Sequence, residues 1–140
     1  MRSAAAAVAI LVVGCGRSGE ERLVDLETFR LHPDFRIELV AVEPQVFDPV
    51  DLAFDESGDA YVLEMPGYPL RDEAGRIVRL RDGDGDGRWE IREVFAEGFA
   101  VADSIMPYRG GLLVASPPDL LFVRDGDGDG VADERTVLLS

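Results

Sequence analysis

One seven-residue stretch, Arg-Asp-Gly-Asp-Gly-Asp-Gly, occurs twice and limits the possible folds more than any other feature of the sequence. The first copy begins at Arg81 and the second at Arg124, 43 residues later. Short apolar stretches separated by turn residues fill the interval, which is typical of consecutive β-strands. A repeat of about 40–45 residues with four strands has the size of a β-propeller blade. The repeat therefore predicts an all-β fold.

The apolar stretches alternate with turn signals along the whole region. We expect strands at residues 35–39, 50–54, 60–65, 76–81, 91–95, 104–108, 112–116, 120–124 and 135–139. Turns are expected at Asp55–Asp59 and at Arg109–Gly111, where Gly can adopt the left-handed conformation. These strands make about two four-stranded blades, whereas a closed propeller needs roughly four to eight. Residues 31–140 are therefore predicted to form a partial β-propeller, with further C-terminal blades beyond Ser140.

The first acidic stretch matches the calcium-loop pattern D-x-[DN]-x-[DN]-G-x5-E in full. Calcium takes six to eight oxygen ligands, and alternate Asp residues converge on one centre when Gly permits a sharp turn. The predicted ligands are the side chains of Asp82, Asp84, Asp86, Glu90 and Glu93 and the carbonyl of Arg88. Glu93, at position twelve, would supply a bidentate carboxylate.

The second stretch repeats this pattern without its last member. Its predicted ligands are Asp125, Asp127, Asp129 and Asp133, with the carbonyl of Val131. Position twelve is Thr136, so the site should be weaker unless Asp133 or Glu134 closes it. A flexible Asp-Gly hairpin turn explains one such loop. Two copies, each with three Asp in five residues, would carry strong repulsion without a cation. An EF-hand is disfavoured because the flanking segments are predicted strands.

Net charge narrows the range of partners. The 140 residues carry 14 basic and 28 acidic side chains, a formal net charge of -14. Such a chain repels phosphate backbones, so no nucleic-acid partner is expected. One cysteine and one histidine, His32, leave no Cys-based zinc site and no catalytic histidine pair. Catalytic and cofactor-binding residues cannot be identified from the sequence.

The N-terminus has the order of a secretory signal. One Arg precedes an apolar run, Ala4–Val13, which ends at Gly14 and Cys15. That run is about half the length needed to cross a bilayer as a helix. Val12–Cys15 resembles a bacterial lipobox, with Val12 in place of the usual Leu. We expect residues 1–14 to be a lipoprotein signal peptide, Cys15 to be lipidated, and residues 15–30 to be a tether. The protein would be exported and lipid-anchored to a membrane, in the periplasm or on the outer surface.

Several segments together resemble one family. They are FRIELVAVEP from residue 35, DPVDLAFDESGDAYVLEMPGYP from residue 48, GRIVRLRDGDGDGRWE from residue 75, VFAEGF from residue 94 and LLVASPPDLLFVRDGDGDGVADE from residue 112. They resemble the exported membrane-bound dehydrogenases abundant in planctomycetes and verrucomicrobia, whose N-terminal propeller is similar to that of PQQ-dependent sugar dehydrogenases. The resemblance implies oxidation of a sugar or alcohol by a quinone cofactor, with electrons passed to a c-type haem domain in larger members. The family's YVxEM…YP segment is matched by Tyr61, Glu64, Met65 and Tyr68.

Two other functions are compatible with these loops. A non-enzymatic, calcium-stabilised binding propeller at the cell surface would use similar Asp-Gly repeats, but such repeats place a hydrophobic pair after the position-nine Asp. Here Glu134 and Arg135 follow Asp133. A linear calcium-repeat adhesion module is disfavoured by the 43-residue spacing and the intervening strands.

Overall fold

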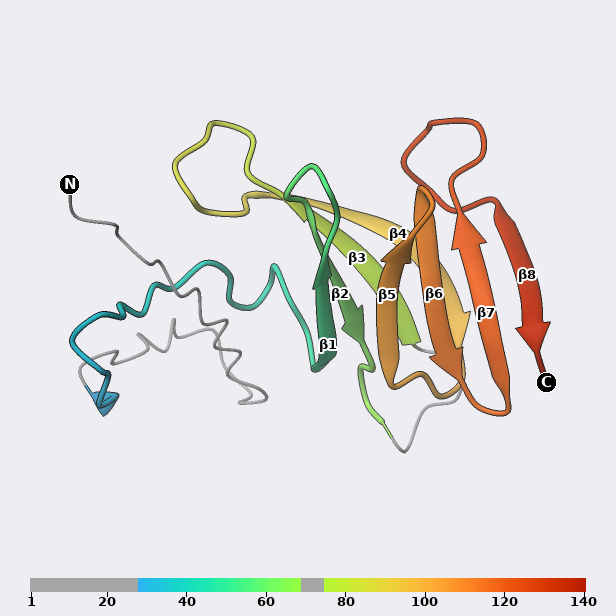
Figure 1. Cartoon of the computed structure of the whole chain (residues 1–140), viewed down its shortest axis with the longest axis horizontal. Coiled ribbons are helices and arrows are strands. Elements are labelled where there is room, and N and C mark those ends of the chain that lie inside the picture. The colour runs from blue at the N-terminus through green and yellow to red at the C-terminus, as the bar shows by residue number, and fades with distance from the viewer. Residues whose placement is uncertain (1–27, 69–74) are drawn as a thin grey trace.

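The computed structural model describes residues 28–68 and 75–140. Its regular elements are eight strands in two four-stranded antiparallel sheets, each with its strands in chain order (Figure 1). Sheet 1 comprises β1 (Pro49–Phe54), β2 (Ala60–Glu64), β3 (Gly75–Arg81) and β4 (Ile91–Phe99). Sheet 2 comprises β5 (Ser104–Tyr108), β6 (Gly111–Ser116), β7 (Asp119–Arg124) and β8 (Glu134–Leu139). The all-β prediction is confirmed.

The main hydrophobic core lies between the two sheets. Side chains of a strand alternate between its two faces, so one face of each strand can supply this core. Sheet 1 contributes Tyr61, Leu63 and Ile77, and sheet 2 contributes Leu112, Val114, Leu121 and Val123. The inner strands β1 and β5 also meet, because the Asp51 carboxylate accepts the N–H of Ile105 at 2.8 Å.

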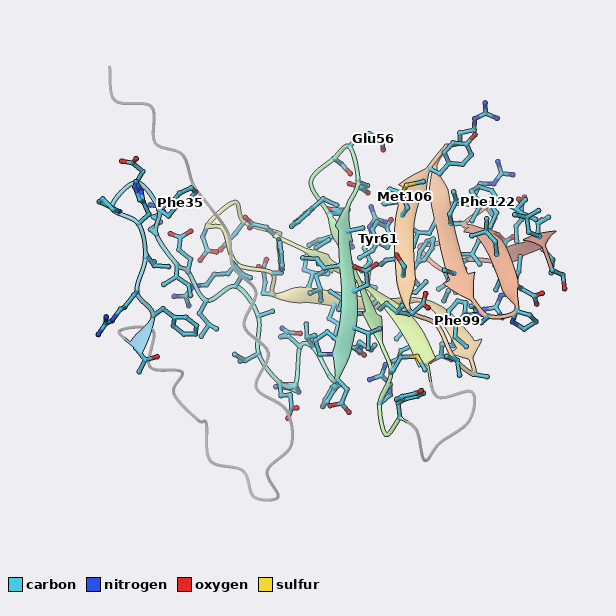
Figure 2. All side chains as sticks on the ribbon, turned by 60° about the horizontal axis from the view of Figure 1, so that its bottom comes forward. Phe35, Glu56, Tyr61, Phe99, Met106 and Phe122 are labelled. Atoms are coloured by element: carbon cyan, nitrogen blue, oxygen red, sulfur yellow. The ribbon has the colours of Figure 1, made fainter. Side chains whose placement is uncertain are left out.

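The opposite face of sheet 1 is covered by the segment that precedes β1. Val40, Ala41 and Val46 pack there against strand residues that include Val62 and Val78. The sequence predicted a strand at residues 35–39, and this prediction is wrong, because no strand among the described residues pairs with this segment. Phe35 is 51% exposed and lies away from both sheets (Figure 2).

Each sheet packs its third strand against the part of the fold that precedes that sheet in the chain. Val78 and Leu80 of β3 face the layer that precedes sheet 1, and Leu121 and Val123, which lie 43 residues later, face sheet 1 from β7. Each sheet therefore covers its predecessor with equivalent residues. This is the arrangement of a partial β-propeller with two blades.

Other predicted segments lie outside the described residues. They are the signal peptide at 1–14, the lipidation site Cys15 and most of the tether at 15–30. Among the residues that the structure describes, no helix has the length and hydropathy of a membrane span.

Candidate metal centres

The two acidic loops have the same length and the same place in their sheets. Residues 82–90 connect β3 to β4, and residues 125–133 connect β7 to β8. Both loops project from the same end of the two sheets (Figure 1). We number the positions of each loop from one to nine, starting at Asp82 and at Asp125.

Glycine is required at the even positions for two different reasons. Gly85 and Gly87 have φ angles of 81° and 89°, and the equivalent Gly128 and Gly130 have 85° and 94°. This left-handed region is costly for residues with a Cβ atom. At position two the reason is space, because a Cβ on Gly83 would lie 2.6 Å from a carboxylate oxygen of Glu90. The alternating glycines thus let the chain curl around the acidic side chains.

The first Asp of each loop organises the backbone. Asp82 accepts the N–H groups of Gly85 at 2.6 Å and Gly87 at 2.8 Å, and Asp125 accepts those of Gly128 and Gly130 at the same distances. These bonds favour the charged form, so they lower the pKa of Asp82 and of Asp125, with the position-six glycine as the largest cause in each. Both carboxylates are therefore anionic at neutral pH.

The carboxylates of each loop converge. Oxygens of Asp82, Asp84, Asp86 and Glu90 all lie within 4.8 Å of one another, and so do oxygens of Asp125, Asp127 and Asp129. Glu90 at position nine accepts the N–H of Gly83 at 2.6 Å, and Asp133 at position nine accepts that of Gly126 at 2.6 Å. Position nine therefore accepts the same backbone N–H in both loops, but only Glu90 joins its carboxylate cluster, and the predicted ligand Asp133 is not brought to the second one.

The predicted ligand Glu93 is not brought to the first cluster. It lies on β4, and both of its oxygens are 2.9 Å from the guanidinium of Arg81, the residue just before the loop. In the second loop, Arg124 makes the same kind of pair with Glu134, at 3.0 and 2.8 Å. Thr136 at position twelve lies on β8, opposite Phe122. The expected difference between the loops at position twelve therefore has no counterpart in the geometry.

Position seven bonds within each loop, and position eight attaches the loop to its surroundings. Arg88 and Val131 at position seven donate their N–H groups to the Asp two residues before, each at 2.8 Å. At position eight, Trp89 is buried, and its N–H points to the carbonyl of Val40 at 3.5 Å. Ala132 in the same position donates its N–H to the carbonyl of Phe95 at 2.7 Å.

Sequence reasoning missed the arginine pairs and the position-eight anchors. An arginine precedes Asp82 and Asp125 in both copies, and an acidic residue follows on the outgoing strand in both. This repeated arrangement of an arginine before the loop and an acidic residue after it was the signal that could have predicted the arginine–glutamate pairs. Nothing in the sequence distinguishes Trp89 and Ala132 as equivalent anchors, because their side chains differ in size and only their backbone N–H groups act alike.

The donor set limits the chemistry of these clusters. The side chains gathered in both loops offer carboxylate oxygens, with no imidazole or thiolate among them. Hard cations such as Ca²⁺ prefer oxygen ligands, whereas zinc and copper sites use nitrogen or sulfur. The residues therefore fit a hard divalent cation.

Comparison with known proteins gives one match. A family model described as a domain of unknown function, DUF7133, matches residues 23–140. Neither the curated proteins nor the solved structures include a match to the chain. The matched region contains both sheets and both acidic loops. The chain therefore belongs to the DUF7133 family.

Proposed function

We propose that both acidic loops bind Ca²⁺. The ion in the first loop would hold sheet 1 against the segment before β1, and the ion in the second loop would hold sheet 2 against sheet 1. The observation that carries this proposal is the duplication of one loop geometry. Each loop gathers three carboxylates from positions one, three and five, and closes through position nine. Like charges so close together repel one another, and a divalent cation would remove that repulsion.

Calcium fits this proposal better than magnesium. Calcium tolerates six to eight oxygens in a flexible arrangement, whereas magnesium demands near-ideal octahedral geometry and keeps much of its water. The loops offer several side-chain oxygens on a glycine-rich backbone at the surface. Extracellular calcium modules commonly have dissociation constants of about 10⁻⁴ to 10⁻³ M. Affinity in that range suits a structural ion in an exported protein.

The fastening role follows from the position-eight anchors. Ala132 bonds to Phe95 of β4, so an ion that orders the second loop also orders its contact with sheet 1. In the first loop, the carbonyl of Glu90 accepts a hydrogen bond from the Gln45 side chain at 3.1 Å. Each loop therefore reaches the preceding layer of the fold.

Terbium luminescence and calorimetry test the proposal on the chain that begins at Cys15. Trp89 lies within the first loop, so it should sensitise a terbium ion bound there. Calorimetry should detect two calcium sites. Asp84→Asn should abolish the luminescence and leave one site, and Asp127→Asn should leave the luminescence intact and also leave one site. No heat and no luminescence at millimolar ion would overturn the proposal.

We also propose that the chain is an exported lipoprotein held at a membrane through Cys15. The lipobox-like segment supports this proposal, because the single thiol of the chain follows the apolar run directly. Replacing Cys15 by Ala should move the protein from the membrane fraction to the soluble fraction of the expressing cell. Unchanged fractionation would exclude a lipid anchor at this residue.

The resemblance to membrane-bound dehydrogenases supports a hypothesis about the whole protein: that it oxidises a sugar or alcohol with PQQ. Dye-linked sugar oxidation by the full-length protein supplied with PQQ would test it. The described residues do not fit PQQ, because the quinone is anionic, the loops are acidic, and six described arginines already pair with Asp or Glu. We therefore assign no catalytic step to them. A non-enzymatic binding propeller would use the calcium loops in the same architectural role.

A further inference from the structure

A cavity of about 230 Å³ lies between the two sheets. Tyr61, Arg79 and Phe95 of sheet 1 line one side, and the turn between β5 and β6 lines the other. Asp55 and Glu56, from the turn between β1 and β2, also belong to its wall. Figure 2 shows Tyr61 between the sheets and Glu56 at the tip of this turn. The cavity is large enough to hold several water molecules.

The hydroxyl of Tyr61 is the unusual group in this cavity. Tyr61 is only 8% exposed, and its ring packs edge-on against Phe95 with the ring centres 5.1 Å apart. The ring is buried, but the hydroxyl oxygen stays accessible from the cavity and makes no hydrogen bond within the described residues. Burial raises the pKa of Tyr61, with Asp55 and Asp59 adding to the rise and Arg79 opposing it. The phenol is therefore neutral at physiological pH and free to bond to a ligand.

The charges around the cavity favour a cation. Asp55, Glu56 and Asp125 line it, and the Arg79 guanidinium is held by Asp59, with Nε 2.8 Å from Oδ2. Asp125 turns both oxygens toward its own loop, so it contributes charge rather than a ligand atom. In the described parts of the chain, three or more carboxylates converge only within the two acidic loops. The cavity is therefore not a third metal site.

We propose that this cavity binds a small organic cation that carries a primary ammonium group. The ammonium would donate hydrogen bonds to the Tyr61 oxygen and to the free carboxylate oxygens of Asp55 and Glu56. Asp55 uses its Oδ1 to accept the N–H groups of Ser57 and Asp59, which leaves Oδ2 available. The methylene groups of the cation would lie against the ring of Phe95.

The test uses 1,4-diaminobutane as the probe and 1,4-butanediol as its neutral counterpart. Both are titrated into the chain that begins at Cys15, with EGTA present, and binding is followed by calorimetry and by NMR shifts. The diamine should bind at one site, at least about tenfold more tightly than the diol. Tyr61→Phe keeps the ring and should weaken diamine binding about tenfold, in line with the loss of a hydrogen bond to a charged group.

Three further variants test the role of the acidic turn, the specificity for the cavity and the independence from the calcium loops. Glu56→Gln removes one acceptor charge at an exposed turn and should weaken binding severalfold without affecting folding. Tyr68→Phe, outside the cavity, should bind like the wild type. The double variant Asp84→Asn with Asp127→Asn should keep diamine binding, which separates this site from the calcium loops. Equal affinity for the diol, or equal affinity in wild type, Tyr61→Phe and Glu56→Gln, would overturn the proposal, and so would loss of binding in the double variant.

Discussion

Two glutamates of sheet 1 show how burial changes the value of an ion pair. Glu64 is fully buried and accepts hydrogen bonds from the N–H of Phe47 at 2.9 Å, from Arg76 at 2.6 Å and from Arg92 at 3.0 Å. Both guanidiniums also lie over the ring of Phe47, at 5.6 and 6.0 Å from its centre. Glu64 thus holds the segment before β1 on the sheet. Glu93, by contrast, forms a surface pair with Arg81, with side chains 42% and 37% exposed.

This contrast gives a matched pair of substitutions. Glu64→Gln removes the charge that two arginines share, and loss of one partner from a buried pair is costly. Because both arginines can still reach water, we expect a loss of about 2–3 kcal/mol in the free energy of unfolding. Glu93→Gln should cost less than about 1 kcal/mol, as is usual for surface pairs. Urea denaturation at constant m-value measures both. Equal losses would mean that burial does not decide the effect.

Pairing between strands explains what the sequence could and could not predict about the elements. Alternation and turn residues located all eight strands, because these signals are local. The same alternation wrongly predicted a strand at residues 35–39, since a local pattern does not show whether a neighbouring strand exists. Which residue closes the first loop depends on how β3 and β4 are aligned, and this strand register cannot be read from a local sequence pattern. Arg81 pairs with Ile91, so the loop ends at position nine and Glu93 falls on β4 opposite Arg79.

The second loop shows the same dependence on register. Arg124 pairs with Glu134, which again ends the loop at position nine. A twelve-residue calcium pattern assumes that the chain keeps curling beyond this point, as it does before a helix. An antiparallel strand instead turns alternate residues to opposite faces and removes position twelve from the cluster. Loop flanks therefore decide which carboxylates a calcium pattern can use.

At the scale of the whole molecule, the second loop joins the two sheets through its backbone and through the strand that follows. Beyond the bond from Ala132 to Phe95, the guanidinium of Arg135 on β8 donates to the carbonyl of Glu97 at 2.6 Å and lies 4.5 Å from the ring centre of Phe99. All three partners belong to β4. Order in the loop is thus coupled to the contact between the sheets.

Calcium should therefore protect the contact between the sheets as well as the loops themselves. Hydrogen exchange at the N–H of Ala132 should slow when calcium is added, by up to about 100-fold at a concentration 100 times the dissociation constant. Asp127→Asn should abolish this protection, and Asp84→Asn, in the first loop, should preserve it. If calcium slows exchange at Gly128 and Gly130 but not at Ala132, the ion orders the loop without fastening the sheets. Protection at all three amides would identify the second loop as the calcium-dependent joint between the blades.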